Sequence, residues 1–366
     1  VHAAGAGELA RAGRAHLELA EEERRRHAYV DAELEYSAAL ARLDGDEERM
    51  RALAGRASVR YQIHRLDDAL ADAAAARALA ESLGDQRDTV ELLLLEAMIL
   101  DWKFDVDACE ERTARARALV TGLTDLEPAL VAAEGRNACR REDFTRGAEL
   151  LARAGAEGDY QTRITSIVLL AGVLAFLGRT HESAVWFERV ISLCEEVGDD
   201  FHLAIALSNR TALWSRLGHI DRATLDLRRA IEIARRFGNA LVERTASYNL
   251  AEQLYWQGDL EGALPLALRT RELQQRFVGD DELPDSALLV ARIQAARGQH
   301  DAARAELELV RGSDGLAPTA RALIRMLDLV LAPSASADEW EDLERAVAAL
   351  DSAEILLEVQ RFAGKR

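Results

Sequence analysis

The side chains that could carry out catalysis or bind a metal are scattered along this chain of 366 residues. Its three cysteines, Cys109, Cys139 and Cys194, form no close pair, and none of its eight histidines stands in a metal-binding spacing such as H-E-x-x-H. The sequence also contains no phosphate-binding loop of the form G-x-x-x-x-G-K-[ST]. We therefore expect a protein that is not an enzyme and that uses no metal or cofactor.

Binding chemistry is concentrated at Tyr248, Tyr255 and Trp256. Aromatic residues make up only 5% of the chain, so three of them within nine consecutive residues stand out. Aromatic and Arg side chains dominate the energetics of protein interfaces. The cluster therefore indicates either a partner-binding surface or packing between neighbouring helices.

Charge and composition limit the class of partner. The formal net charge of −18 disfavours nonspecific nucleic-acid binding, which requires neutralised phosphates. Lys occurs only at Lys103 and Lys365, so almost all positive charge is Arg; this reflects either a GC-rich genome or an Arg-lined groove for acidic ligands. No apolar run is long enough to span a bilayer. We expect a cytoplasmic protein that binds neither nucleic acid nor membrane.

Four glycines that are spaced 40 residues apart mark an internal repeat: Gly178, Gly218, Gly258 and Gly298. A fixed period of this length predicts a stacked array in which each unit packs on its neighbours. Ala, Leu, Arg and Glu dominate the composition and only five residues are Pro, which favours helix throughout. The expected fold class is all-α.

A stripe of small and apolar residues follows each of these marker positions. After Gly178 it consists of Thr180, Ser183, Phe187 and Val190, and spacings of three and four place such residues on one helical face. The stripe recurs without a glycine after positions 27, 64, 104, 142 and 338. The nine markers predict nine helix pairs, in which helix A ends at the marker and helix B carries the stripe.

The Leu177-Gly178 turn and the stripe of helix B resemble the tetratricopeptide repeat family over nearly the whole chain. The long period resembles the kinesin-light-chain variant, and also the tetratricopeptide regions of bacterial signalling kinases and nucleotide-switch ATPases. The resemblance implies a right-handed superhelical solenoid of about nine antiparallel helix pairs.

In this family helix A lines a concave groove, so the resemblance implies that residues at fixed distances before each marker face a partner. Before the marker at 258 these distances select Thr245 and the aromatic cluster. The candidate partner-binding residues along the chain are Tyr248, Glu252, Tyr255, Trp256, Arg216, Trp102, Arg136 and Arg140.

Asn209 and Asn249 occupy the same phase in adjacent repeats. In related arrays a groove Asn holds the backbone of an extended peptide, because an amide both donates and accepts hydrogen bonds; the alternative is that both bridge neighbouring helices. Arg210 stands where the family usually has Leu. We expect it to lie along the helix edge or to pair with an acid such as Glu243 or Glu252.

The expected organisation is a linker at 1–7, a solenoid at 8–352, and a capping helix or truncated tenth repeat at 353–366. The function that we expect is a non-catalytic scaffold or sensor region of a larger bacterial signalling protein, which binds a protein or peptide in its groove. The alternative is a free-standing adaptor or peptide receptor whose superhelix changes pitch when ligand binds.

Overall fold

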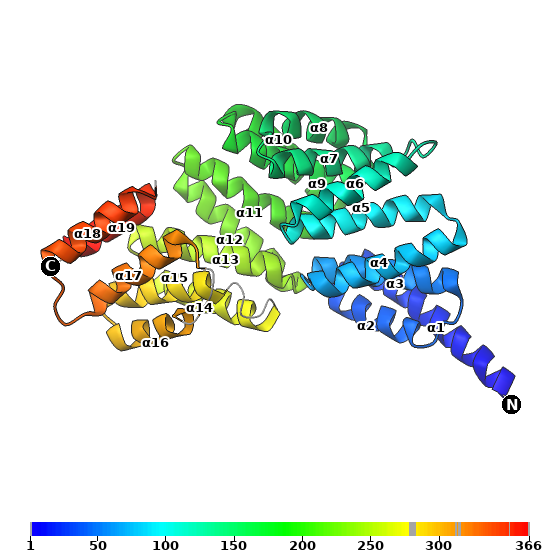
Figure 1. The fold of residues 1–366 in the computed structure, drawn as a ribbon, viewed down its shortest axis with the longest axis horizontal. Coiled ribbons are helices and arrows are strands. Elements are labelled where there is room, and N and C mark those ends of the chain that lie inside the picture. The colour runs from blue at the N-terminus through cyan, green and yellow to red at the C-terminus, as the bar shows by residue number, and fades with distance from the viewer. Residues whose placement is uncertain (1, 278–282, 312, 314–315, 351, 365–366) are drawn as a thin grey trace. The chain divides into compact units, whose positions relative to one another are not determined.

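The computed structural model describes residues 2–277, 283–311, 313, 316–350 and 352–364 (Figure 1). Every regular element in these residues is a helix. The chain divides into two compact units, which we call unit 1 (Val1–Val242) and unit 2 (Glu243–Arg366). The prediction of an all-α repeat array is confirmed.

Unit 1 consists of antiparallel helix pairs in which the odd-numbered helix is helix A and the even-numbered one is helix B. The pairs are α1 (His2–Arg25) with α2 (Tyr29–Leu40), α3 (Asp46–Gln62) with α4 (Leu66–Leu83), α5 (Gln86–Trp102) with α6 (Val106–Leu119), α7 (Glu127–Arg140) with α8 (Phe144–Glu157), α9 (Tyr160–Phe176) with α10 (Thr180–Val197), and α11 (Asp200–Arg216) with α12 (Ile220–Phe237).

Unit 2 continues the same alternation of helix A and helix B. It ends in a helix A that is followed by no helix B in the described residues. Its helices are α13 (Ala240–Gln257), which begins at the end of unit 1, α14 (Leu260–Phe277), α15 (Leu283–Ala296), α16 (His300–Val310), α17 (Pro318–Leu331), α18 (Ala337–Ala348) and α19 (Ala353–Ala363). Helix α19 lies beside α18 and also contacts α17 (Figure 1).

The turns between helix A and helix B adopt a left-handed backbone at eight of the nine markers. The four glycines have φ between 72° and 85°, and the four other markers, His27, His64, Phe104 and Glu142, have φ between 57° and 64°. An L-residue in this region costs about 1–2 kcal/mol. The geometry of the array therefore fixes the turn even where the sequence does not supply the favoured residue.

The ninth marker, at 338, is wrong as a turn. Helix α18 already begins at Ala337, because Ser336 forms a capping box with Glu339: each side chain satisfies a backbone N–H of the other residue. The stripe that we assigned to this helix is nevertheless correct, since Trp340, Leu343 and Val347 are buried.

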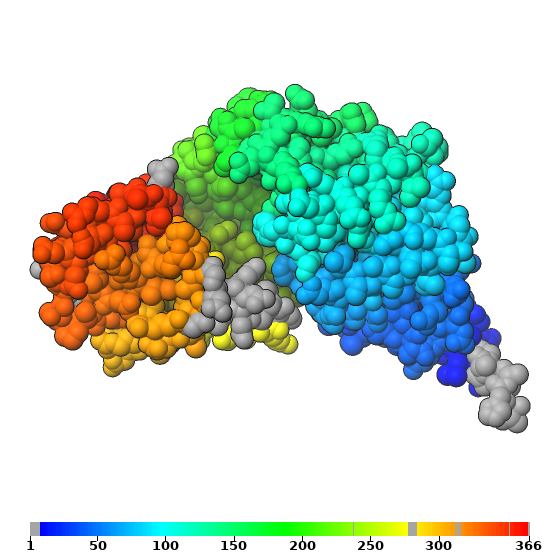
Figure 2. Space-filling view, in the orientation of Figure 1, coloured from blue at the N-terminus to red at the C-terminus, as the bar shows by residue number. Residues whose placement is uncertain are grey.

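The odd-numbered helices form the inner row of unit 1. The backbones of successive odd helices lie close together from α1 to α11. Neighbouring even helices are instead linked by long side chains, as in the ion pairs of Arg115 with Glu81 and of Arg229 with Glu195. A curved array packs most closely on its inner side, so the odd helices line the inner face. The stripes of helix B fill the space within each pair, and Ser183, Phe187 and Val190 are wholly buried. On the face that Figure 2 shows, the side chains from α2 to α8 form a continuous surface.

The two ends of the chain differ from a plain repeat. Residues 2–7, which we expected to be a linker, belong to α1; the other boundaries, 8–352 and 353–366, stay a prediction. None of the described helices is both long and apolar enough to cross a membrane.

Candidate functional site

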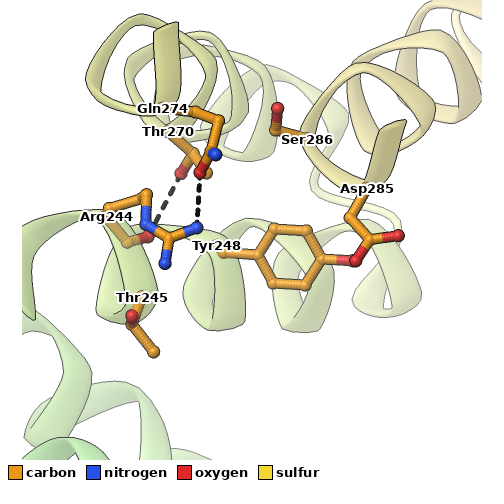
Figure 3. A pocket seen from close by; sticks show the side chains of 7 residues that line it. All are labelled: Arg244, Thr245, Tyr248, Thr270, Gln274, Asp285 and Ser286. Carbon is orange, nitrogen blue, oxygen red and sulfur yellow. Dashed lines mark hydrogen bonds between the residues drawn. The ribbon is translucent and has the colours of Figure 1, made fainter. Parts of the chain in front are cut away.

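A pocket of about 220 Å³ opens between three helices of unit 2 (Figure 3). Spacings of three and four residues put its lining side chains on single helical faces. They are Arg244, Thr245 and Tyr248 on α13, Thr270 and Gln274 on α14, and Asp285 and Ser286 on α15.

Hydrogen bonds between α13 and α14 hold one wall of this pocket. The Arg244 guanidinium donates to Oε1 of Gln274 (Figure 3). The Thr270 hydroxyl is shared between the Leu266 carbonyl of its own helix at 3.0 Å and the Arg244 carbonyl at 3.4 Å. The bond from Arg244 fixes the Gln274 amide with its oxygen toward Arg244. The amide nitrogen, Nε2, has no hydrogen-bond partner among the described residues, although Gln274 is 0% exposed.

Tyr248 supplies the aromatic surface of the pocket. Its ring extends from α13 toward Asp285 of α15 (Figure 3). Burial, together with the negative charge of Glu252, raises the pKa of the Tyr248 hydroxyl. The hydroxyl therefore keeps its proton at neutral pH and can donate a hydrogen bond.

A buried ion pair lies further along the same helices. Arg292 of α15 donates from Nε and Nη2 to the two carboxylate oxygens of Glu358, at 2.8 and 2.6 Å, and from Nη1 to Glu252 at 3.1 Å. The Tyr255 hydroxyl also donates to Glu358, at 2.6 Å. Glu358, which comes from α19, is 0% exposed.

The charge of Glu358 sets the protonation of its neighbours. Burial by itself would lower the pKa of Arg292, but the charge and hydrogen bonds of Glu358 outweigh burial and raise it. Burial, with the same charge, raises the pKa of Tyr255. Arg292 therefore stays a cation and Tyr255 a donor at neutral pH, as a carboxylate acceptor requires.

Aromatic rings surround the Arg292 guanidinium. Its central carbon lies 5.0 Å from the centre of the Tyr255 ring and 5.9 Å from that of the Trp256 ring. Both distances are within the range of cation–π attraction. Arg361 of α19 lies 5.7 Å from the Tyr255 ring.

The pocket and the ion pair belong to one surface, which we call the α13 site. Tyr248 and Tyr255 are seven residues apart, so they share a face of α13 and are separated by about 10 Å along the helix axis. The charges of Arg292 and Glu358 both act on the Tyr248 hydroxyl.

The structure brings four of the predicted site residues together at this site: Tyr248, Glu252, Tyr255 and Trp256. Asn249 lies half-buried on the same helix. Sequence reasoning missed Gln274, Arg292 and Glu358. Arg292 could have been found, because it stands six residues before the marker at 298 as Glu252 stands six before 258.

The other predicted residues lie in unit 1. Trp102, at the end of α5, is half exposed with its ring near those of Tyr61 and His64. Arg140 pairs with Asp101 at 2.6 Å, and Arg136 is half-buried on the same helix, α7. Asn209 and Arg216 are exposed on α11.

The partners that we named for Arg210 are wrong. Arg210 makes two hydrogen bonds to Asp226 on α12, at 2.7 and 2.8 Å, and one to Glu188 on α10 at 2.7 Å. Residues sixteen positions apart face each other here because α11 and α12 form an antiparallel pair. Glu243 pairs with Arg269 instead.

The cysteines are poor nucleophiles. Burial raises the pKa of the Cys109 and Cys139 thiols to about 11 and that of Cys194 to about 12. A thiol with such a pKa carries almost no thiolate at neutral pH. The described residues contain no group of three or more His, Cys, Asp or Glu that could hold a metal ion.

A second pocket, of about 310 Å³, lies in unit 1. Glu21, Arg24 and Arg51 line it together with Asp88 and Glu91. Burial raises the pKa of both of these last two carboxyls. We place the candidate site at α13 because that surface gathers the predicted aromatic cluster and holds a buried donor that has no partner in the described part of the chain.

No family model and no curated protein matches this sequence. Solved structures share its fold. The Rap protein complexed with competence and sporulation factor has 14% identity and a TM-score of 0.56, and the match covers 88% of this chain and 98% of that one. NprR in complex with its cognate peptide NprX has 14% identity and a TM-score of 0.51, with 83% and 96% covered.

A third similar structure is the signal transduction ATPase with a tetratricopeptide repeat sensor from Pyrococcus horikoshii. It has 14% identity and a TM-score of 0.53, and the match covers 80% of this chain but only 45% of that one. Identities at this level establish the fold alone. The chain therefore has the tetratricopeptide-repeat-like solenoid fold.

Proposed function

We propose that this chain is a non-catalytic receptor that binds a peptide or an extended protein segment at the α13 site. The observation that carries the proposal is the buried amide nitrogen of Gln274, which lines the pocket without a hydrogen-bond partner among the described residues. A buried donor without a partner costs about 1–3 kcal/mol. A ligand that offers a carbonyl oxygen there would remove this cost.

The size and polarity of the pocket suit a peptide. A volume of about 220 Å³ is below the roughly 300–1,000 Å³ of a typical drug-sized site, so it accommodates one side chain with its backbone amide. Gln274 and Tyr248 can donate hydrogen bonds to a ligand, and the Asp285 carboxylate can accept them. Such alternation of donors and acceptors matches a peptide backbone.

The fold relatives support binding of this kind. NprR was solved with a cognate peptide and the Rap protein with competence and sporulation factor. The ATPase from Pyrococcus horikoshii uses its repeats as a sensor. They support both versions of the proposal: a sensor region in a larger bacterial signalling kinase or nucleotide-switch ATPase, or a free-standing cytoplasmic receptor. The length of the gene distinguishes the two.

The proposal is tested with peptides selected from a random displayed library against the purified chain. Their dissociation constants are then measured for the unmodified chain, for Gln274→Leu, which removes the donor at similar volume, and for Tyr248→Ala. We expect each substitution to weaken binding at least about fivefold, as the loss of one buried hydrogen bond or one aromatic contact would.

Gln257→Ala is the matched control, because Gln257 is an exposed residue at the end of the same helix. It should leave the dissociation constants unchanged. Selected peptides that bind all four chains equally would place the binding surface elsewhere.

A further inference from the structure

Helix α19 makes a contact that the repeat pattern does not require. Each odd helix from α3 to α11 packs on the odd helix before it; in unit 2, α17 likewise packs on α15, and α19 contacts α17. Glu358 of α19, however, reaches Arg292 on α15 and Tyr255 on α13, which precede it by 66 and 103 residues. An additional repeat would contact only its neighbour.

We infer that α19 is a built-in occupant of the α13 site, and that Glu358 takes the position of a carboxylate group of the peptide ligand. This inference rests on the proposed function. It adds the chemical class of the ligand, an acidic peptide, and the way in which access to the site is controlled.

The receptor for the carboxylate is complete without α19. Arg292, Glu252, Tyr255 and Trp256 all belong to α13 and α15. Arg presents a planar fork that matches the two oxygens of a carboxylate, and Glu252 would remain a partner for Arg292 if Glu358 left. One carboxylate can therefore replace another at this site, and Arg292 keeps an ion-pair partner throughout the exchange.

Helix α19 is too short to be stable without its contacts to the rest of unit 2. It has 11 residues, and an isolated helix of fewer than about 12–15 residues is marginal in water. Apart from Glu358, its buried side chains are Val359 and Phe362, which join the core of unit 2, and Ile355, Leu356 and Ala363 pack against that core. Leu357 is 60% exposed. Glu358 therefore supplies the polar part of the contact.

The residues that α19 places in the site indicate the sequence pattern of a competing peptide. They present a carboxylate that is followed by apolar side chains one and four positions later, at Val359 and Phe362. On a helix Phe362 is a neighbour of both, because it follows Glu358 by four positions and Val359 by three. A competing ligand would be a peptide with Glu or Asp followed by apolar residues in this spacing.

The first test uses a fluorescent synthetic peptide of residues 352–364 and the full chain. Fluorescence anisotropy gives the affinity of the peptide for the unmodified chain and for Glu358→Gln. The substitution weakens the chain's own α19, so we expect the added peptide to bind at least about tenfold more tightly to Glu358→Gln than to the unmodified chain. The same peptide with Gln in place of Glu358 should bind neither.

Glu354→Gln is the matched control, because Glu354 lies exposed on the same helix. This variant should behave like the unmodified chain. If the peptide fails to bind a Glu358→Gln chain whose circular dichroism shows it to be folded, α19 is a fixed part of the array and the inference is overturned.

Hydrogen exchange on the unmodified chain covers the case in which Glu358→Gln does not fold. A displaceable helix opens locally, so amides of α19 should exchange at least about tenfold faster than those of α15. Equal protection of the two helices would overturn the inference.

The outcomes also separate the inference from the proposed function. If library peptides bind through Tyr248 and Gln274 but do not compete with the α19 peptide, the receptor stands and the role of Glu358 is overturned. If the α19 peptide binds Glu358→Gln but no foreign peptide binds either chain, the proposed function fails, and with it the assignment of Glu358 as a ligand substitute.

Discussion

Two wholly buried glutamates, Glu96 in unit 1 and Glu358 in unit 2, use the same chemistry for different purposes. Glu96 on α5 accepts hydrogen bonds from Arg77 on α4 at 2.6 Å and from Arg112 on α6 at 2.5 Å. Its partners lie on the helices immediately before and after it. The partners of Glu358 lie on helices that are separated from α19 by at least three others.

The sequence separation between each glutamate and its partners determines which part of the structure its ion pairs stabilise. A contact between neighbouring helices stabilises the stacking of repeats, which is the ordinary basis of a solenoid. A contact between the last helix and an earlier pair can break while the stacking persists. Glu96 is therefore a structural residue, whereas Glu358 is placed to regulate access to the α13 site.

The largest effect that the comparison predicts is that of Arg292→Leu. The substitution leaves the Glu358 carboxylate buried without its cation, and breaking a buried pair in this way costs about 3–5 kcal/mol. Because Glu358 can escape burial when α19 opens, we expect the free energy of unfolding of unit 2 to fall by up to this amount and that of unit 1 to stay unchanged. Hydrogen exchange resolved by helix measures both.

Arg297→Leu serves as the control for that loss, because Arg297 follows the same helix but pairs with the exposed Glu261. Exposed pairs contribute about 0–1 kcal/mol. An equal loss from both substitutions would mean that burial does not distinguish the Arg292 pair.

A smaller and more local effect is expected from Glu96→Gln. Arg77 and Arg112 are both partly exposed, so water can solvate them in part, and the loss should be about 1–3 kcal/mol. Hydrogen exchange should accelerate together in α4, α5 and α6. Glu358→Gln should instead accelerate exchange in α19 alone; acceleration throughout α13 to α19 would contradict the distinction between the two glutamates.

Most of the architecture could be predicted from the sequence, because one stripe of small and apolar residues encodes each helix pair. The stripe located turns at His27, His64, Phe104 and Glu142, where no glycine marks them, and each has a positive φ. It failed at 338 because local capping by Ser336 starts α18 earlier. A repeat pattern reports packing between helices and contains no information on individual caps.

The candidate site was less predictable. Tyr248 and Glu252 were selected by their distances from the repeat marker at 258. The same distance of six residues before the marker at 298 would also have selected Arg292. It could not select Glu358, because α19 has no marker and the contact spans 103 residues to Tyr255. The ion-pair partners of Arg210 could not be predicted for the same reason. Asp226 and Glu188 lie on the two helices that pack against α11, and spacing along one helix does not identify them.

The smallest predicted difference between the units is their response to pH. His27 lies 3.9 Å from Asp199 and stacks on Phe201, and burial lowers the pKa of His27 below its usual 6.5. Because the unfolded chain then binds the proton more readily, unit 1 should lose stability as the pH falls below about 6.5. Unit 2 has one histidine, His300, which is exposed and lies outside any such buried cluster, so we expect a weaker response from this unit.

His27→Asn isolates this contribution, because Asn tolerates the left-handed backbone at this position. Thermal unfolding of unit 1 between pH 7 and 5 should depend less on pH in the variant; an unchanged dependence would exclude His27 as its source. At lower pH a second loss is expected. Hydrogen bonds from His202 overcome the effect of burial and lower the pKa of Asp199 to about 2, so its stabilisation should disappear as the pH falls from about 4 towards 2.

The most direct test of the central claim is hydrogen exchange of α19 in the unmodified chain, with and without a selected peptide whose binding depends on Tyr248 and Gln274. If that peptide takes the position of α19, the amides of α19 should exchange faster in the complex, while those of α5 around Glu96 keep their protection. Protection of α19 that stays the same or increases when the peptide binds would contradict the account.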